Sequence, residues 1–366
     1  QQASPGNRMG PDTCLQLLFP VIRIVCCRQH STDVHLKKEE RLFIKQTRFT
    51  GHSTILQIFV LAAALLLLGS VADGTCRSFR VGTWKTAQTI QPFYYEQFAP
   101  EGMTGRVFPF TNPADQKTAL LAGSLDMCGT TLAHAIHSAS NGQPVVVVAA
   151  LCNKCSALVV KADGPVRKVG DLAGKRIGYV PGTMHEILLR ETLVRNGLSP
   201  VRDVTLTRVD FFDMGLALAK GDIDAFLSGE PFPSMAVSNG VGRILSYPYY
   251  GDSIGTINAG MLVKRRTIEK NPELVYSLVA AHARATEYLA AHPEKWLDKA
   301  STFGTSRNVL EKAGHNMELA WKMDKAFVER AKALGERMET LGVIRNQPDY
   351  DRLFDLSFVR RVEKEQ

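Results

Sequence analysis

Three short segments place hydroxyl side chains and backbone N–H groups where a predicted strand gives way to a helix. They are residues 84–86, 130–131 and 182–185. A helix N-terminus carries unpaired N–H groups and the positive end of the macrodipole, so it can hold an anion without a basic side chain. The threonine hydroxyls also suit N-caps, a role that is compatible with ligand contact. The segments therefore predict non-covalent capture of a small ligand.

Four side chains of the candidate site have to be weighed individually, two of them from the segments above. His185, in a helix's first turn, would be a neutral hydrogen-bond partner for a ligand or a solvated helix residue. Trp84 would stack on a ligand or belong to the core. Glu230 would meet a cationic group, which argues against a purely anionic ligand. Asn258 precedes a predicted strand and is a weaker candidate.

Two motifs of common enzymes are missing from the sequence. It contains no H-E-x-x-H and no P-loop ending in Lys-Ser/Thr. His134 and His137 are spaced i, i+3 without an evident third ligand, so ordinary helix residues are favoured. The sequence therefore predicts a protein that is not an enzyme, with no catalytic residue, metal site or cofactor.

Cys152 and Cys155 form a C-x-x-C pair. A zinc site needs four ligands as a rule, and after residue 72 no second C-x-x-C and no H-x₃₋₅-H is present. In an oxidising compartment a structural disulfide becomes possible. A local disulfide or two inert thiols is favoured over redox catalysis, and we expect both thiols to be dispensable for ligand binding.

Strand and helix signals alternate from residue 79 onward, which predicts an α/β fold with a mostly parallel sheet. Residues 120–128 and 218–226 repeat one layout, in which a helix ends at Gly123 or Gly221 and an Asp precedes a short strand. The pair predicts two related lobes. Beyond residue 272 the pattern turns helical, with stretches near residues 308–313, 317–341 and 350–362, which predicts a helical C-terminal tail.

The first 72 residues read as a leader that is not part of the fold. Residues 55–68 are a 14-residue run with one polar member, preceded by basic Lys45 and Arg48. Ser70 and Ala72 follow in a small-x-small pattern, so a signal peptide cut after Ala72 is predicted. A span of about 20 residues would be needed for an uncleaved anchor, and the residues before Cys76 do not suit a lipoprotein. The predicted location is the periplasm.

Charge and composition narrow the function further. The 366-residue chain has 44 Lys+Arg and 36 Asp+Glu, and half of the net charge of +8 falls in the first 72 residues. No long basic cluster with interleaved aromatics appears, so nucleic-acid binding is excluded as a function.

Four motifs together resemble a known family. AGSLDMCGTT, SALVVKADGPVRKVGDLAGKRIGYVPGTMHEILL, ALAKGDIDAFLSGEPFP and GMLVKRRTIEKNPELV occur in this order between residues 122 and 275. They look like the nitrate/sulfonate/taurine-type periplasmic substrate-binding proteins of ABC transporters, over roughly residues 79–300. The resemblance implies a two-lobed periplasmic-binding-protein type II fold. Lobe 1 would comprise residues 78–160 plus 260–366 and lobe 2 residues 161–259, with hinge strands at 156–160 and 260–264.

The resemblance also implies which residues line the interlobe cleft. Its candidates for ligand binding, together with those named above, are Trp84, Thr86, Thr130, Thr131, Gly182, Thr183, Met184, His185, Glu230 and Asn258. The Glu230-Pro231 phrase matches the family's strand-end W-x-P or W-E-P, but Gly229 stands where the aromatic residue usually lies. That departure removes a bulky wall and leaves the pocket size open.

The function implied is capture of a small anionic or zwitterionic molecule, similar to a sulfonate, nitrate or taurine, by a monomer that delivers it to an ABC transporter permease. Two alternatives stay open. One is an enzyme similar to the thiamine-pyrimidine precursor synthases, which share this fold but carry a dense Cys cluster that residues 151–155 match only thinly. The other is a ligand-sensing domain without a transporter.

Overall fold

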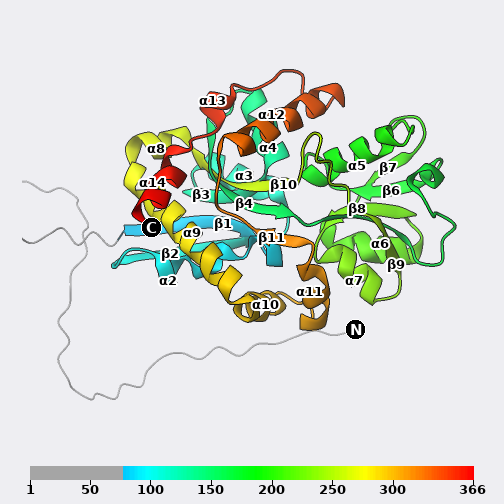
Figure 1. The fold of residues 1–366 in the computed structure, drawn as a ribbon, viewed down its shortest axis with the longest axis horizontal. Helices are drawn as coiled ribbons and strands as arrows, with labels where there is room; N and C mark the ends of the chain where they lie inside the picture. Colours follow the sequence, from blue (N-terminus) through cyan, green and yellow to red (C-terminus); the bar gives the residue numbers. More distant parts are fainter. Residues whose placement is uncertain (1–76) are drawn as a thin grey trace, which may run out of the picture. The chain divides into compact units, whose positions relative to one another are not determined.

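The computed structural model describes residues 77–366, which belong to one unit of the chain. They form two β-sheets with helices packed on them (Figure 1). The strands of the first sheet are β1 (Arg77–Trp84), β2 (Met103–Phe110), β3 (Met127–Thr131), β4 (Val145–Lys154), β10 (Ile257–Lys264) and β11 (Met317–Leu319). Those of the second are β5 (Ser156–Lys161), β6 (Arg176–Tyr179), β7 (Thr205–Arg208), β8 (Ala225–Gly229) and β9 (Gly242–Ser246).

The helices follow the strands in the alternation that the sequence predicted. They are α2 (Tyr95–Phe98), α3 (Pro113–Ala122), α4 (Leu132–Ser140), α5 (Met184–Arg195), α6 (Met214–Lys220), α7 (Phe232–Ser238), α8 (Arg265–Lys270), α9 (Pro272–Ala291), α10 (Pro293–Ser301), α11 (Arg307–Gly314), α12 (Lys325–Thr340), α13 (Tyr350–Leu353) and α14 (Ser357–Glu365). The predicted two-lobed α/β fold with a helical C-terminal region is confirmed. We call each sheet with its helices a lobe; Figure 1 shows the second lobe in green.

The two sheets are mixed, so the expectation of a mostly parallel sheet was wrong in detail. The first has order β11-β4-β10-β3-β1-β2 and the second β7-β6-β8-β5-β9. Strand β10 runs antiparallel to β3 and β4, and β5 runs antiparallel to β8 and β9. These are the strands that enter a sheet from the other lobe, so they run against its parallel strands.

The two lobes repeat one corner, as the sequence predicted. Helices α3 and α6 end at Gly123 and Gly221, whose φ values of 86° and 78° a glycine adopts without strain. Arg80 pairs with Asp126 at 2.7 Å, and Arg176 pairs with Asp224 at 3.1 Å. Each arginine also donates to the carbonyl of the helix-ending glycine. The same residue types at the same places support two related lobes.

The chain crosses between the lobes directly after β4 and again before β10. Lys154 and Cys155 have φ values of 59° and 69°, which turn the chain out of the first sheet. The predicted hinge strand 156–160 pairs inside the second sheet, so we propose the first lobe boundary at residue 155 instead of 160. For the second boundary, where the chain returns to the first lobe, we keep the proposal at residue 260.

The predicted helical stretch at residues 317–341 was wrong at its start, because residues 317–319 form a strand. They form β11, which pairs antiparallel with β4 at residues 152–154, and α12 starts only at Lys325. Pairing with the open edge of the first sheet outweighs the local helix preference of this stretch. Among the residues that the structure describes, no helix is long and apolar enough to span a membrane; the predicted signal peptide and Cys76 lie outside them.

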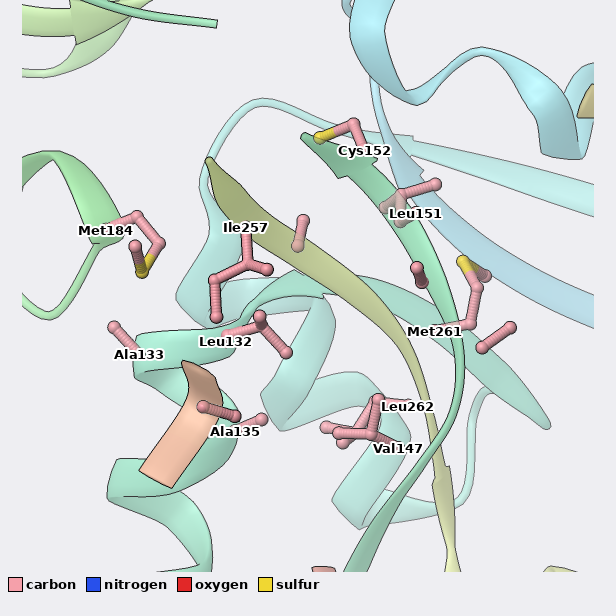
Figure 2. Close-up of a cluster of buried hydrophobic side chains, with 14 of the residues drawn as sticks. Leu132, Ala133, Ala135, Val147, Leu151, Cys152, Met184, Ile257, Met261 and Leu262 are labelled. Carbon is pink, nitrogen blue, oxygen red and sulfur yellow. The ribbon is translucent and has the colours of Figure 1, made fainter. Parts of the chain in front are cut away.

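The core of the first lobe extends to the second. Figure 2 shows Leu132 and Ala135 of α4 beside Val147 of β4 and Leu262 of β10, with Met184 of α5 nearby. Met184 is fully buried in this hydrophobic cluster. The N-terminal end of α5 is thereby packed against the neighbouring lobe.

A charged cluster joins α5 to the C-terminal helix α12. The Glu191 carboxylate, 2% exposed, pairs with Arg195 at 2.5 Å and with Arg337 of α12. We expect Glu191→Gln to lower the free energy of unfolding by about 2 kcal/mol, because the two arginines are a quarter to a third exposed and can rehydrate. Urea unfolding measures this change. Glu311→Gln, which removes the exposed pair with Arg307, is the control and should cost under about 0.5 kcal/mol; equal losses would contradict the interpretation.

Candidate functional site

A pocket lies between the two lobes. From the first lobe it is lined by Trp84, Thr86, Gln88, Phe110, Thr111 and Thr131, and from the second by His185, Phe211, Phe212, Gly229 and Phe232. Strands β1, β2, β3 and β8 end at or beside these residues. The carboxyl ends of strands in open α/β sheets are the usual place for a ligand.

The pocket is aromatic, and none of its lining residues is Lys, Arg, Asp or Glu. The rings of Phe211 and Phe232 stack with centroids 6.1 Å apart, and Phe212 meets Phe232 edge-on at 4.8 Å. Trp84 and Phe110 stand at the ends of β1 and β2. Such walls favour a ligand with an apolar, flat part.

His185 is the polar group that the second lobe supplies. It is 5% exposed, its Nδ1 lies 3.0 Å from the hydroxyl oxygen of Ser156, and its ring meets Phe211 edge-on. Burial lowers the pKa of His185 to about 3, so the ring is neutral at physiological pH. A Cβ at Gly229 would lie 2.8 Å from His185 Nε2, which shows how closely the imidazole approaches the backbone of β8. His185 is thus a buried neutral ring at the pocket wall, and the alternative of a solvated helix residue is wrong.

Four of the predicted residues line the pocket: Trp84, Thr86, Thr131 and His185. Thr131 also caps α4, since its hydroxyl accepts from the N–H of His134 at 3.3 Å. Thr130 is buried behind the wall, and its hydroxyl has no hydrogen-bond partner among the described residues.

Gly182, Thr183 and Met184 do not line the pocket. The Thr183 hydroxyl donates to the Val180 carbonyl at 2.7 Å and accepts from the Glu186 N–H at 3.3 Å. The Gly182 N–H donates to the Glu186 carboxylate at 2.6 Å. Helix α5 therefore binds its own carboxylate at the terminus where the sequence predicted an anion site.

Glu230 and Asn258 lie at the crossing between the lobes and also do not line the pocket. The Glu230 carboxylate accepts from the Ser234 N–H at 3.1 Å, and burial raises its pKa. The Asn258 amide donates to the Lys154 carbonyl at 2.7 Å and lies 3.3 Å from Cys155 Sγ. Both side chains are used within the protein, so we propose positioning roles for them in place of ligand contact.

Sequence reasoning missed the pocket residues Gln88, Phe110, Thr111, Phe211, Phe212 and Phe232. Phe110 ends β2 as Trp84 ends β1, and Phe211 follows β7. The strand-end signal that identified Trp84 was present at these positions as well.

Cys152 and Cys155 are buried free thiols in the structure. The hydrogen bond with Cys152, together with burial, raises the pKa of Cys155 well above its usual range. The raised pKa disfavours the reactive thiolate of Cys155. With both thiols buried, this favours the interpretation as inert thiols. The described residues hold no group of three or more His, Cys, Asp or Glu side chains that could bind a metal ion.

We expect the Cys152→Ser, Cys155→Ser double variant to keep its ligand affinity within about twofold, because neither thiol lines the pocket. Its free energy of unfolding should fall by about 1–3 kcal/mol, since two hydroxyls replace buried thiols. Calorimetry and urea unfolding measure the two quantities. A folded variant without binding would contradict this prediction.

The sequence profile of the family described as NMT1/THI5 like matches residues 94–296, more than half of the chain. The chain belongs to the NMT1/THI5-like family. A putative binding protein of Brucella abortus (strain 2308) is 28% identical over 252 residues, 66% of this chain and 76% of that protein. A 4-amino-5-hydroxymethyl-2-methylpyrimidine phosphate synthase of Saccharomyces cerevisiae is 26% identical over 229 residues, 58% of this chain and 66% of that one.

The same two-lobed fold occurs in the alkanesulfonate-binding protein from Xanthomonas axonopodis pv. citri bound to MOPS. That structure has a TM-score of 0.69 and 20% identity, and it covers 76% of this chain and 98% of its own. The likeness confirms the fold that the sequence motifs implied. The relatives include both a binding protein and an enzyme, so the choice between these functions depends on the site itself.

Proposed function

We propose that this protein is a periplasmic solute receptor, which captures a small molecule between its lobes and delivers it unchanged to an ABC transporter permease. The observation that carries the proposal is the pocket walled by both lobes. Closure of two lobes around a ligand would convert binding into a change of shape, which a permease can recognise.

The lining also argues for binding over catalysis. It contains no carboxylate, thiol or amine, and its one titratable ring, His185, is a weak base because burial lowers its pKa to about 3. The buried thiols Cys152 and Cys155 lie outside the lining. A pyrimidine-synthase-like reaction is therefore the second candidate, favoured only by the synthase among the relatives.

Two measurements on the purified chain separate these candidates. A thermal-shift screen against small organic molecules should find a ligand that raises the melting temperature; at 100 times its dissociation constant the gain is about 2.7 kcal/mol. Chromatography of the recovered compound should show it unchanged. Turnover would instead favour the enzyme, and binding without any co-purifying permease would favour a sensor.

A further inference from the structure

Two side chains at the pocket have buried polar atoms without partners. Trp84 is 9% exposed and Gln88 is 5% exposed, and both line the pocket. Among the described residues, Trp84 Nε1 and Gln88 Oε1 have no hydrogen-bond partner. Buried polar groups in proteins are nearly always paired. A donor and an acceptor left open on one wall are therefore places for a ligand's complementary atoms.

Of the other polar side chains of the first lobe's wall, Thr86 and Thr131 are already engaged, and Thr111 is exposed to water. The Thr86 hydroxyl lies 3.0 Å from that of Thr89, and the Thr131 hydroxyl caps α4. The groups left for a ligand are the indole N–H, which only donates, and the Gln88 carboxamide, which both donates and accepts. Opposite them is the neutral ring of His185. A ligand edge that carries an acceptor beside a donor, as an amide does, matches this set.

The electrostatics of the pocket disfavour an anion. The lining holds no cationic side chain, and the N-terminus of α5 is occupied by the Glu186 carboxylate. Transfer of a sulfonate or nitrate from water into such walls would leave its charge beside the N-terminus of α4 but without a cationic side chain, which is costly. An uncharged ligand avoids this cost.

The shape of the walls favours a flat ligand. Five aromatic side chains from both lobes surround the space: Trp84, Phe110, Phe211, Phe212 and Phe232. We infer that the receptor proposed above takes an uncharged planar aromatic or heteroaromatic ring with an amide-like donor–acceptor edge, in place of the sulfonate- or nitrate-like ligand that the sequence implied. This inference rests on the proposed function and names the class of its ligand.

Four probes test the inference by calorimetry on the full chain. Benzamide has the flat ring and the amide edge; cyclohexanecarboxamide keeps the edge without the plane; benzenesulfonate keeps the plane with a charged edge; taurine is a non-planar zwitterionic sulfonate. We expect benzamide to bind about tenfold or more tightly than each of the other three.

Substitutions in the pocket wall test whether the amide edge of benzamide causes its tighter binding. Gln88→Leu should weaken benzamide about tenfold, and Trp84→Phe, which removes the indole N–H but keeps a ring, by several-fold. Gln116→Leu is the matched control, because Gln116 is also buried with an unpartnered carboxamide but does not line the pocket. Its benzamide affinity should stay that of the parent.

The outcomes separate the ligand class from the receptor function. Tighter binding of benzenesulfonate or taurine, lost when the pocket is filled by Gly229→Trp, would overturn the inference and leave the receptor function standing. Benzamide affinity that is the same in Gln88→Leu and Gln116→Leu would overturn the assigned edge. No binding of any probe at millimolar concentration would overturn the inference and leave the receptor function to the thermal-shift screen. Binding that Gly229→Trp does not change would overturn both proposals.

Discussion

Replacing Gly229 with tryptophan is expected to remove ligand binding from a chain that still folds. A Cβ at this position would lie 2.8 Å from His185 Nε2 and 3.4 Å from Cys155 Sγ. The imidazole has little room to retreat, because Ser156 holds its Nδ1 and Phe211 packs on its ring. The added indole must therefore enter the pocket, which Gly229 lines. We expect affinity to fall about a hundredfold or more, which is about 2.7 kcal/mol.

Gly251→Trp is the control for this experiment. Gly251 is exposed, and a Cβ there would meet nothing within 4 Å. Calorimetry should give the parent's affinity for this variant, and circular dichroism should show both variants folded. Gly229→Ala is expected to be intermediate, since it adds only the close Cβ contact. A folded Gly229→Trp protein that binds within about threefold of the parent would place the ligand elsewhere.

The second large effect is loss of stability in mild acid. Burial lowers the pKa of His134 and His282 to about 4 and of His185 to about 3, from a usual value of 6.5. Between pH 6.5 and about 4 the unfolded chain therefore binds up to three protons that the folded chain does not. Stability falls as pH falls through this window, by up to about 4 kcal/mol per pH unit. The raised pKa of Glu230 offsets part of the loss.

Urea unfolding at several pH values between 7 and 4.5 measures this slope. His282→Gln should be less stable at pH 7, because the imidazole lies 2.9 Å from the Tyr95 hydroxyl and 2.8 Å from the Ala150 carbonyl. Its slope should nevertheless be smaller by about 1.4 kcal/mol per pH unit. His134→Gln should lose the same slope, and exposed His292→Gln should keep it. An unchanged slope in both buried variants would refute the histidine origin.

The sequence predicted the fold well because the fold depends on local signals. The two copies of a helix ended by glycine, followed by Asp126 or Asp224, lie at equivalent corners. Strand β11 was missed because three residues pair with a sheet edge that is distant in sequence. Such pairing leaves no local periodicity to read.

The site could be predicted only in part. Trp84, Thr86, Thr131 and His185 could be predicted because they lie at or just after the ends of predicted strands. The topology of the fold brings these strand ends together. The spacing of Thr183 and Glu186 is that of a capping box. In the structure the Thr183 hydroxyl, which was assigned to a ligand, bonds to the Val180 carbonyl and the Glu186 N–H, and the Glu186 carboxylate accepts from the Gly182 N–H. Which phenylalanines face the pocket could not be read, because an aromatic side chain at a strand end serves the core equally well.

The central claim is that the interlobe pocket holds a small molecule without converting it. The most direct test titrates benzamide into the parent and Gly229→Trp proteins by calorimetry and then analyses the recovered solution by chromatography. We expect one site per parent chain, no measurable site in the variant, and benzamide recovered unchanged. Equal binding by both proteins, or a converted compound, would contradict the claim.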